Sequence, residues 1–208
     1  MYTPIDEGLE PELSVSNMTA LRAALGDAIQ DHQAIAMLDL GNKRSRLLIS
    51  EGDIGHPQPV FHHMQLGMDL LANRTFKQRM PNELQLEQAI MLVEDAVMPV
   101  ARLIPPSNVF VTRDPYLLEV GLQALGVRDL NANWQETGRL PLLTREAVEA
   151  QFDLLARQAT HPQLPQGDLP QSPHWAAALV LLREILHHWQ LGAVRLLPQG
   201  LALQLPKG

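Results

Sequence analysis

Two short apolar runs, residues 34–38 and 47–49, enclose a polar turn that has a glycine at position 41. This arrangement is the pattern of a β-hairpin, because each run can form a strand and the glycine permits a tight reversal. We therefore predict strands over residues 35–40 and 45–50. A fold that contains such a hairpin must build a sheet around it, so the hairpin constrains every later element.

A third strand is predicted near residues 59–66, after the turn-forming stretch 51–55. Three successive strands with short connections form an antiparallel meander. Farther along, the apolar spacing becomes that of helices, which alternate with short strands. Such alternation requires crossover connections, and crossovers add parallel strands to a sheet. The later predicted elements are helices 83–102, 115–125, 144–158 and 175–189 and strands 109–111 and 194–197.

The composition indicates one globular domain. The chain has 208 residues, 46% of them hydrophobic, which is enough for a sizeable core. We predict an irregular N-terminal segment over residues 1–16 and a single domain over residues 17–208. Within the domain, a helix is predicted over residues 18–29 and irregular chain over residues 127–143.

The charge and the missing cysteines exclude several classes of function. The net charge of −7 at pH 7 argues against nucleic acid or an anionic membrane as a partner. With no cysteine, the chain has no disulfide, no thiolate nucleophile and no cysteine-based metal site. No apolar run approaches the roughly 20 residues that span a bilayer, and the acidic, proline-containing N-terminus is not a signal peptide. We expect a cytoplasmic protein.

Six stretches, in this order and spacing, resemble the second (C-terminal) domain of the exopolyphosphatase / guanosine pentaphosphate phosphohydrolase (Ppx/GppA) family. They are residues 13–29, residues 35–49, Leu66-Gly-Met, residues 109–114, residues 179–192 and residues 194–201. The resemblance implies an α/β fold of the ribonuclease-H-like, actin-like ATPase type. It also implies a five-stranded mixed sheet, with the antiparallel meander first and parallel additions after it, and helices on both faces.

The same resemblance marks where this chain departs from the family. The family's first phosphate loop reads Asp-x-Gly-Gly-Gly-Ser-Thr-Glu, of which this chain keeps Asp39 and Gly41. The other positions carry Asn42, Lys43, Arg44, Ser45 and Arg46. In the second loop, Thr112, Arg113 and Asp114 stand for Gly-Gly-Thr. A Cβ at the glycine positions disfavours positive φ, and long side chains occupy the space that phosphate oxygens need.

Two further departures point the same way. The family's Arg-Ala-Asp and the glycine after it read here as Gln171, Ser172, Pro173 and Ala178. The family's first domain, which contributes a carboxylate across the cleft, has no counterpart in these residues. The resemblance therefore implies a stand-alone domain with degenerate phosphate loops, a pseudoenzyme.

Asp39 is the candidate catalytic residue, because in the family this aspartate assists the metal ion and the attacking water. Alternatively, it is a turn residue that hydrogen-bonds to nearby backbone. Positively charged side chains can take the place of backbone N–H groups around an anion, so the two loops also form a candidate anion site. The alternative is that the charged residues form a solvated hairpin tip. The residues of the candidate anion site are Gly41, Asn42, Lys43, Arg44, Ser45 and Arg113.

No metal site and no cofactor are expected, apart from Mg²⁺ if the domain is active. The histidine pairs 62–63 and 187–188 do not chelate together, because adjacent side chains diverge on strands and on helices. No His-x-x-x-His spacing occurs in the sequence.

Three functions remain open from the sequence. The first is a degenerate phosphatase-family domain that binds a protein partner or an anionic ligand such as polyphosphate or a phosphorylated nucleotide. The second is a phosphoanhydride phosphohydrolase completed by another subunit. The third is a structural homo-oligomer, most simply a dimer. Helix 175–189 is apolar on more than one side, which is typical of a core helix, and part of it could also bury against a partner.

Overall fold

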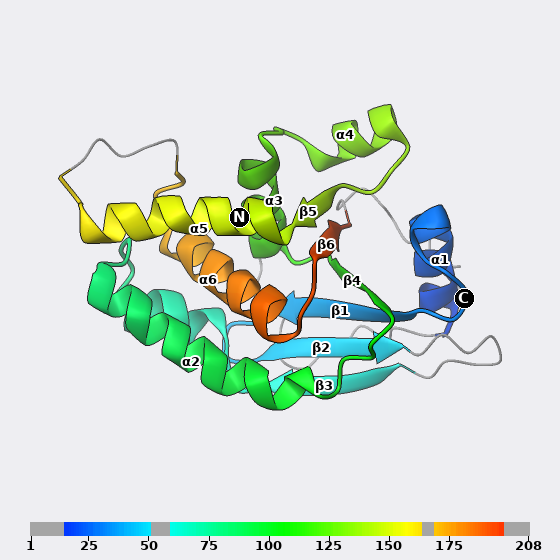
Figure 1. Ribbon diagram of the computed structural model, residues 1–208, viewed down its shortest axis with the longest axis horizontal. Helices are drawn as coiled ribbons and strands as arrows, with labels where there is room; N and C mark the ends of the chain where they lie inside the picture. The colour runs from blue at the N-terminus through cyan, green and yellow to red at the C-terminus, as the bar shows by residue number, and fades with distance from the viewer. Residues whose placement is uncertain (1–14, 51–58, 164–168, 198–208) are drawn as a thin grey trace.

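A six-stranded mixed sheet forms the centre of the computed structural model, which describes residues 15–50, 59–163 and 169–197 (Figure 1). The strand order is β3-β2-β1-β4-β6-β5. Antiparallel pairs join the first three strands along the chain, and parallel pairs join β1 to β4 and β4 to β6. This confirms the predicted meander followed by parallel additions. The strands are β1 (Ala34–Leu40), β2 (Ser45–Ser50), β3 (Val60–Met64), β4 (Asn108–Thr112), β5 (Leu142–Thr144) and β6 (Ala193–Leu196).

The predicted count of five strands is wrong, because a sixth strand, β5, closes one edge of the sheet. β5 pairs antiparallel with β6, with Leu143 opposite Val194. It has three residues, too few to show an alternating pattern. It follows helix α4 (Leu130–Thr137), which also lies in the stretch 127–143 predicted to be irregular.

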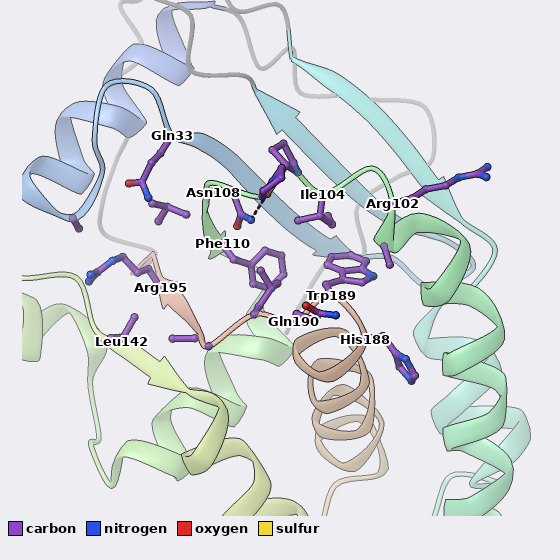
Figure 2. Close-up of a pocket in the computed structure, with 18 residues that line it drawn as sticks. Gln33, Arg102, Ile104, Asn108, Phe110, Leu142, His188, Trp189, Gln190 and Arg195 are labelled. Carbon is purple, nitrogen blue, oxygen red and sulfur yellow. Dashed lines mark hydrogen bonds between the residues drawn. The ribbon is translucent and has the colours of Figure 1, made fainter.

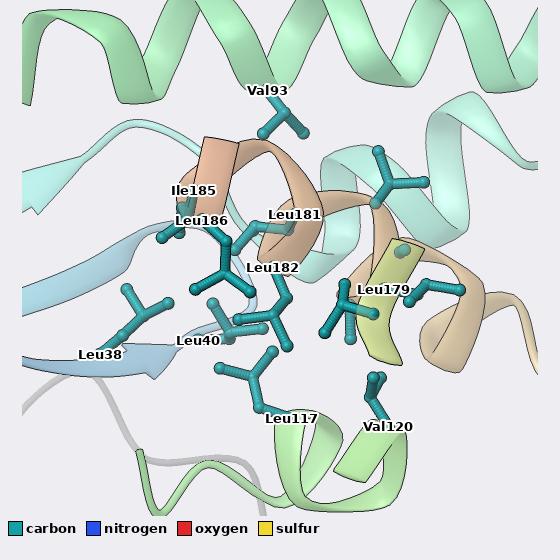
Figure 3. Packing of buried hydrophobic residues seen from close by; sticks show 14 of the residues in the cluster. Leu38, Leu40, Val93, Leu117, Val120, Leu179, Leu181, Leu182, Ile185 and Leu186 are labelled. Atoms are coloured by element: carbon teal, nitrogen blue, oxygen red, sulfur yellow. The ribbon is translucent and has the colours of Figure 1, made fainter. Parts of the chain in front are cut away.

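Helix α6 (Pro173–His188) lies across one face of the sheet and is buried along most of its length. Its leucines pack towards β1 on one side and towards the surrounding helices on the others (Figure 3). The core-helix interpretation is therefore confirmed, and the protein itself covers the several apolar sides of α6. The surrounding helices are α2 (Glu83–Ala101), α3 (Pro115–Leu125), α5 (Arg145–Thr160) and the π-helix η2 (Asp69–Thr75).

The opposite face of the sheet is covered by helix α1 (Val15–Leu25), so helices do lie on both faces. Leu21 and Leu25 of α1 pack in one cluster with Ile35 and Met37 of β1. Alternation along β1 explains this division, because its even-numbered apolar residues belong to the α6 side. The helix begins three residues before its predicted start and ends in a 3₁₀ turn, η1 (Gly26–Ala28).

Several expectations fall on residues outside the described part of the chain. These are most of the irregular segment 1–16, the turn at 51–55 and the end of the matching stretch 194–201. Among the helices that are described, none is long and apolar enough to cross a membrane.

Candidate functional site

The two predicted loops meet at one edge of the sheet, where the parallel strands β1 and β4 reach their carboxyl ends. Ligands of open α/β sheets commonly bind at this edge. Asp39 lies near the end of β1, directly opposite Arg46 of β2. Arg113 and Asp114 follow β4 immediately. Sheet pairing, and not sequence proximity, therefore assembles the candidate site.

Asp39 is 7% exposed and held between two arginines. Its Oδ2 lies 3.1 Å from a terminal guanidinium nitrogen of Arg46, and its Oδ1 lies 3.7 Å from Nε of Arg113. Arg46 is itself fixed, with its guanidinium carbon 5.5 Å from the centre of the Phe61 ring. Opposite residues of an antiparallel pair share a face, which explains why Arg46 reaches Asp39. The turn interpretation of Asp39 missed these pairs, because they depend on strand register.

The hairpin tip is a closed turn, held by backbone hydrogen bonds within the turn and to residues 68 and 69. The amide of Gly41 donates to the Arg44 carbonyl at 3.0 Å, and the carbonyls of Gly41 and Asn42 accept from Met68 and Asp69. Among residues 41–46, all of them described, none has a positive φ. An anion nest needs consecutive N–H groups that point outwards. This turn therefore lacks the left-handed residue that a nest of the αR-αL kind requires.

The structure divides the predicted anion site into two groups. Ser45 is fully buried, and its hydroxyl donates to the carbonyl of Leu66 at 2.7 Å. Together with Gly41, it shapes the turn. Asn42, Lys43 and Arg44 are exposed at the tip, whereas Arg113 turns towards Asp39. The predicted cations thus share one edge of the molecule without converging on a single point.

Asp114 is a site residue that the sequence reasoning did not single out. It is 2% exposed and caps α3, since its Oδ1 accepts from the amides of Tyr116 and Leu117. Its Oδ2 accepts from the Leu40 amide at 2.7 Å, which ties the second loop to the end of β1. Burial raises the pKa of Asp114 to about 7, although these three N–H donors act in the opposite direction. The sequence signal was Asp-Pro at a helix start, a common capping pair.

Mg²⁺ is the metal that the fold family implies, and the residues at this edge do not fit it. Mg²⁺ requires oxygen ligands in near-octahedral geometry. Both oxygens of Asp39 face arginines, and both oxygens of Asp114 accept backbone hydrogen bonds. Neither carboxylate presents an oxygen that is ready for a cation.

A cavity of about 820 Å³ lies at the opposite end of the sheet, near the starts of β4 and β6 (Figure 2). Arg102, Arg195 and Trp189 are among the residues that line it. The buried side-chain oxygen of Asn108, another lining residue, has no hydrogen-bond partner in the described part of the chain. None of the predicted site residues lines this cavity, so it belongs to a different part of the molecule.

Comparison with solved structures confirms the resemblance at the level of the fold. A Ppx/GppA family member from Aquifex aeolicus superposes with a TM-score of 0.63 at 14% identity, over 94% of this chain and 62% of that one. An exopolyphosphatase from Cytophaga hutchinsonii gives a TM-score of 0.58 at 11% identity, over 88% and 58%. This chain thus spans about six tenths of these structures. No family sequence model and no curated protein sequence matches it.

Proposed function

We propose that this chain is a Ppx/GppA-like domain that acts by binding an acidic partner protein and has no phosphohydrolase activity of its own. The observation that carries the proposal is the double ion pair of Asp39 with Arg46 and Arg113. A divalent cation placed beside Asp39 would meet two positive charges at close range. The aspartate that the family uses for chemistry therefore serves here to hold two loops together.

The exposed cations of the hairpin tip indicate the kind of ligand. Lys43 and Arg44 are consecutive exposed residues of the turn, and the side chain of Arg113 on the next loop is 36% exposed. No residue of the turn has the positive φ that a nest of the αR-αL kind requires, so we assign recognition to side-chain charge. Exposed positive side chains suit an acidic protein surface, where they speed encounter and set orientation.

The binding proposal is tested with the variant Lys43→Glu/Arg44→Glu and two probes, a poly-glutamate peptide and a polyphosphate chain of equal charge. We expect the wild-type chain to bind the peptide and the variant to bind at least about tenfold more weakly, or about 1.4 kcal/mol. The matched control, Arg128→Glu/Arg139→Glu, makes the same change in charge at two exposed arginines elsewhere. An equal loss in the control, or binding of polyphosphate alone, would contradict the proposal.

The second candidate is the phosphoanhydride hydrolase completed by another subunit, and Asp114 is the observation that favours it. A buried carboxyl with a pKa of about 7 beside a second carboxylate is typical of acid–base sites. In this alternative, Asp39 leaves its arginines to orient water or a metal, and Lys43, Arg44 and Arg113 neutralise developing charge. Phosphoanhydride hydrolysis that persists in Asp39→Ala would exclude this mechanism.

A further inference from the structure

A cluster of three potential metal ligands lies where α2 meets α6, away from both the Asp39 edge and the predicted loops. Glu184 and His188 lie one turn apart on α6 and therefore share a face of that helix. Glu94 approaches them from α2. One ligand atom from each of the three lies within 4.8 Å of the others. Figure 2 shows His188 between the neighbouring ends of the two helices.

Two distances within this cluster, both from His188, suit a tetrahedral ion better than a hydrogen bond. Nε2 of His188 lies 3.4 Å from Oε1 of Glu94 and 3.4 Å from Oε2 of Glu184. A single N–H cannot point at both oxygens, and both distances exceed those of good N–H···O bonds. Ligand atoms bound to Zn²⁺ at about 2.0–2.1 Å in a tetrahedron lie about 3.3–3.4 Å apart. The distance from Nε2 of His188 to each carboxylate oxygen therefore equals the distance between two ligand atoms of a tetrahedral zinc ion.

The charge balance also favours a cation here. Glu184 is 1% exposed, and a buried carboxylate requires compensation. Arg183 binds the other oxygen of Glu184 but is shared with Glu149, whose Oε2 lies 2.9 Å from its Nε. One guanidinium thus faces two carboxylates, and Glu94 adds a third next to His188. A divalent ion would balance the excess negative charge.

The surroundings hold the ligands in place. Arg183 fixes the Glu184 carboxylate while its guanidinium carbon lies 4.3 Å from the centre of the Phe152 ring. The indole N–H of Trp189, the residue after His188, donates to the Val97 carbonyl of α2 at 2.9 Å. Partners of this kind orient first-sphere ligands in known metal sites. The two helices are therefore already held at the separation that a bridging ion needs.

We propose that Glu94, Glu184 and His188 bind one Zn²⁺ ion, which joins α2 to α6 with water in the fourth position. This site is independent of the binding function proposed above and does not share a residue with it. A mixed nitrogen and oxygen ligand set suits zinc, whereas Mg²⁺ would require more oxygen ligands. Direct contacts of His188 with the two carboxylates, with no metal ion between them, are the competing arrangement.

The test is titration of the metal-stripped full chain with Zn²⁺, followed by calorimetry and by thermal unfolding. We expect one ion per chain and a higher unfolding temperature, with no such effect of Mg²⁺. Co²⁺ is the spectroscopic probe, because a tetrahedral site gives intense visible absorption and scattered surface histidines do not.

His188→Ala and Glu94→Gln are expected to weaken zinc binding at least about tenfold, within the range seen when groups that support a metal site are removed. Glu94 is 40% exposed, so its variant keeps the test valid if substitutions at the buried Glu184 prevent folding. His187→Ala is the matched control, because it removes the adjacent exposed histidine. The proposal would be overturned if only His187→Ala lost zinc binding while the two ligand variants kept it. It would also be overturned if the wild-type chain bound no stoichiometric zinc.

Discussion

At the scale of single residues, the buried carboxyl of Asp114 should make the stability of the fold depend on pH. Burial raises its pKa to about 7 from 3.8, so the folded chain retains a proton that the unfolded chain releases between these values. The resulting stabilisation is fully present below the unfolded pKa and is lost as the pH rises through about 7. We expect the free energy of unfolding to fall between about pH 4 and about pH 7, by at most about 4 kcal/mol. Urea unfolding at several pH values measures it.

Asp114→Asn separates this effect from the capping role of Asp114. Asparagine also caps helices, but only one of its two terminal side-chain atoms can accept hydrogen bonds. We therefore expect Asp114→Asn to lower the free energy of unfolding by about 1–3 kcal/mol and to leave little pH dependence from this position. Asp129→Asn is the control, because Asp129 caps α4 from an exposed position. Retention of the wild-type pH dependence in Asp114→Asn would show that another group causes it.

At the scale of elements, the hairpin tip depends on Gly67, which follows β3. A Cβ added there would lie 2.3 Å from the carbonyl oxygen of Asn42, a backbone atom that cannot move aside easily. We expect Gly67→Ala to lower the free energy of unfolding by about 1–3 kcal/mol and to break the contact between the hairpin tip and the chain around Gly67. Gly192→Ala is the control, because nothing lies within 4 Å of its added Cβ. Equal urea midpoints for the two variants would contradict this packing.

At the scale of the whole molecule, the homo-oligomer remains a prediction, and α2 is where we expect its interface. Leu84, Met91 and Met98 are 73%, 64% and 57% exposed and seven residues apart, so they form one apolar stripe along the helix. We expect Met91→Glu to convert a dimer to a monomer in light scattering. Leu154→Glu on α5, at a position 43% exposed, is the control. A wild-type chain that stays monomeric at high concentration would exclude this dimer.

The sequence predicted those parts of the fold that have strong local signals. The hairpin, helix α2 and the core helix α6 were predictable, because glycine turns and apolar spacing act over a few residues. β5 was not, because three residues become a strand only by pairing with β6. The pairs of Asp39 depend on register, and the Glu94–Glu184–His188 cluster depends on how two helices pack. Neither kind of contact has a local signal.

We propose that a fold shared with Ppx/GppA phosphatases carries a binding site in this chain in place of a hydrolytic one. The most direct test of this proposal is phosphate release by the purified chain from polyphosphate, guanosine pentaphosphate and nucleotides, with Mg²⁺ present. We predict release no faster than in buffer, because Asp39 is held by Arg46 and Arg113. Metal-dependent release that disappears in Asp39→Ala would contradict the claim.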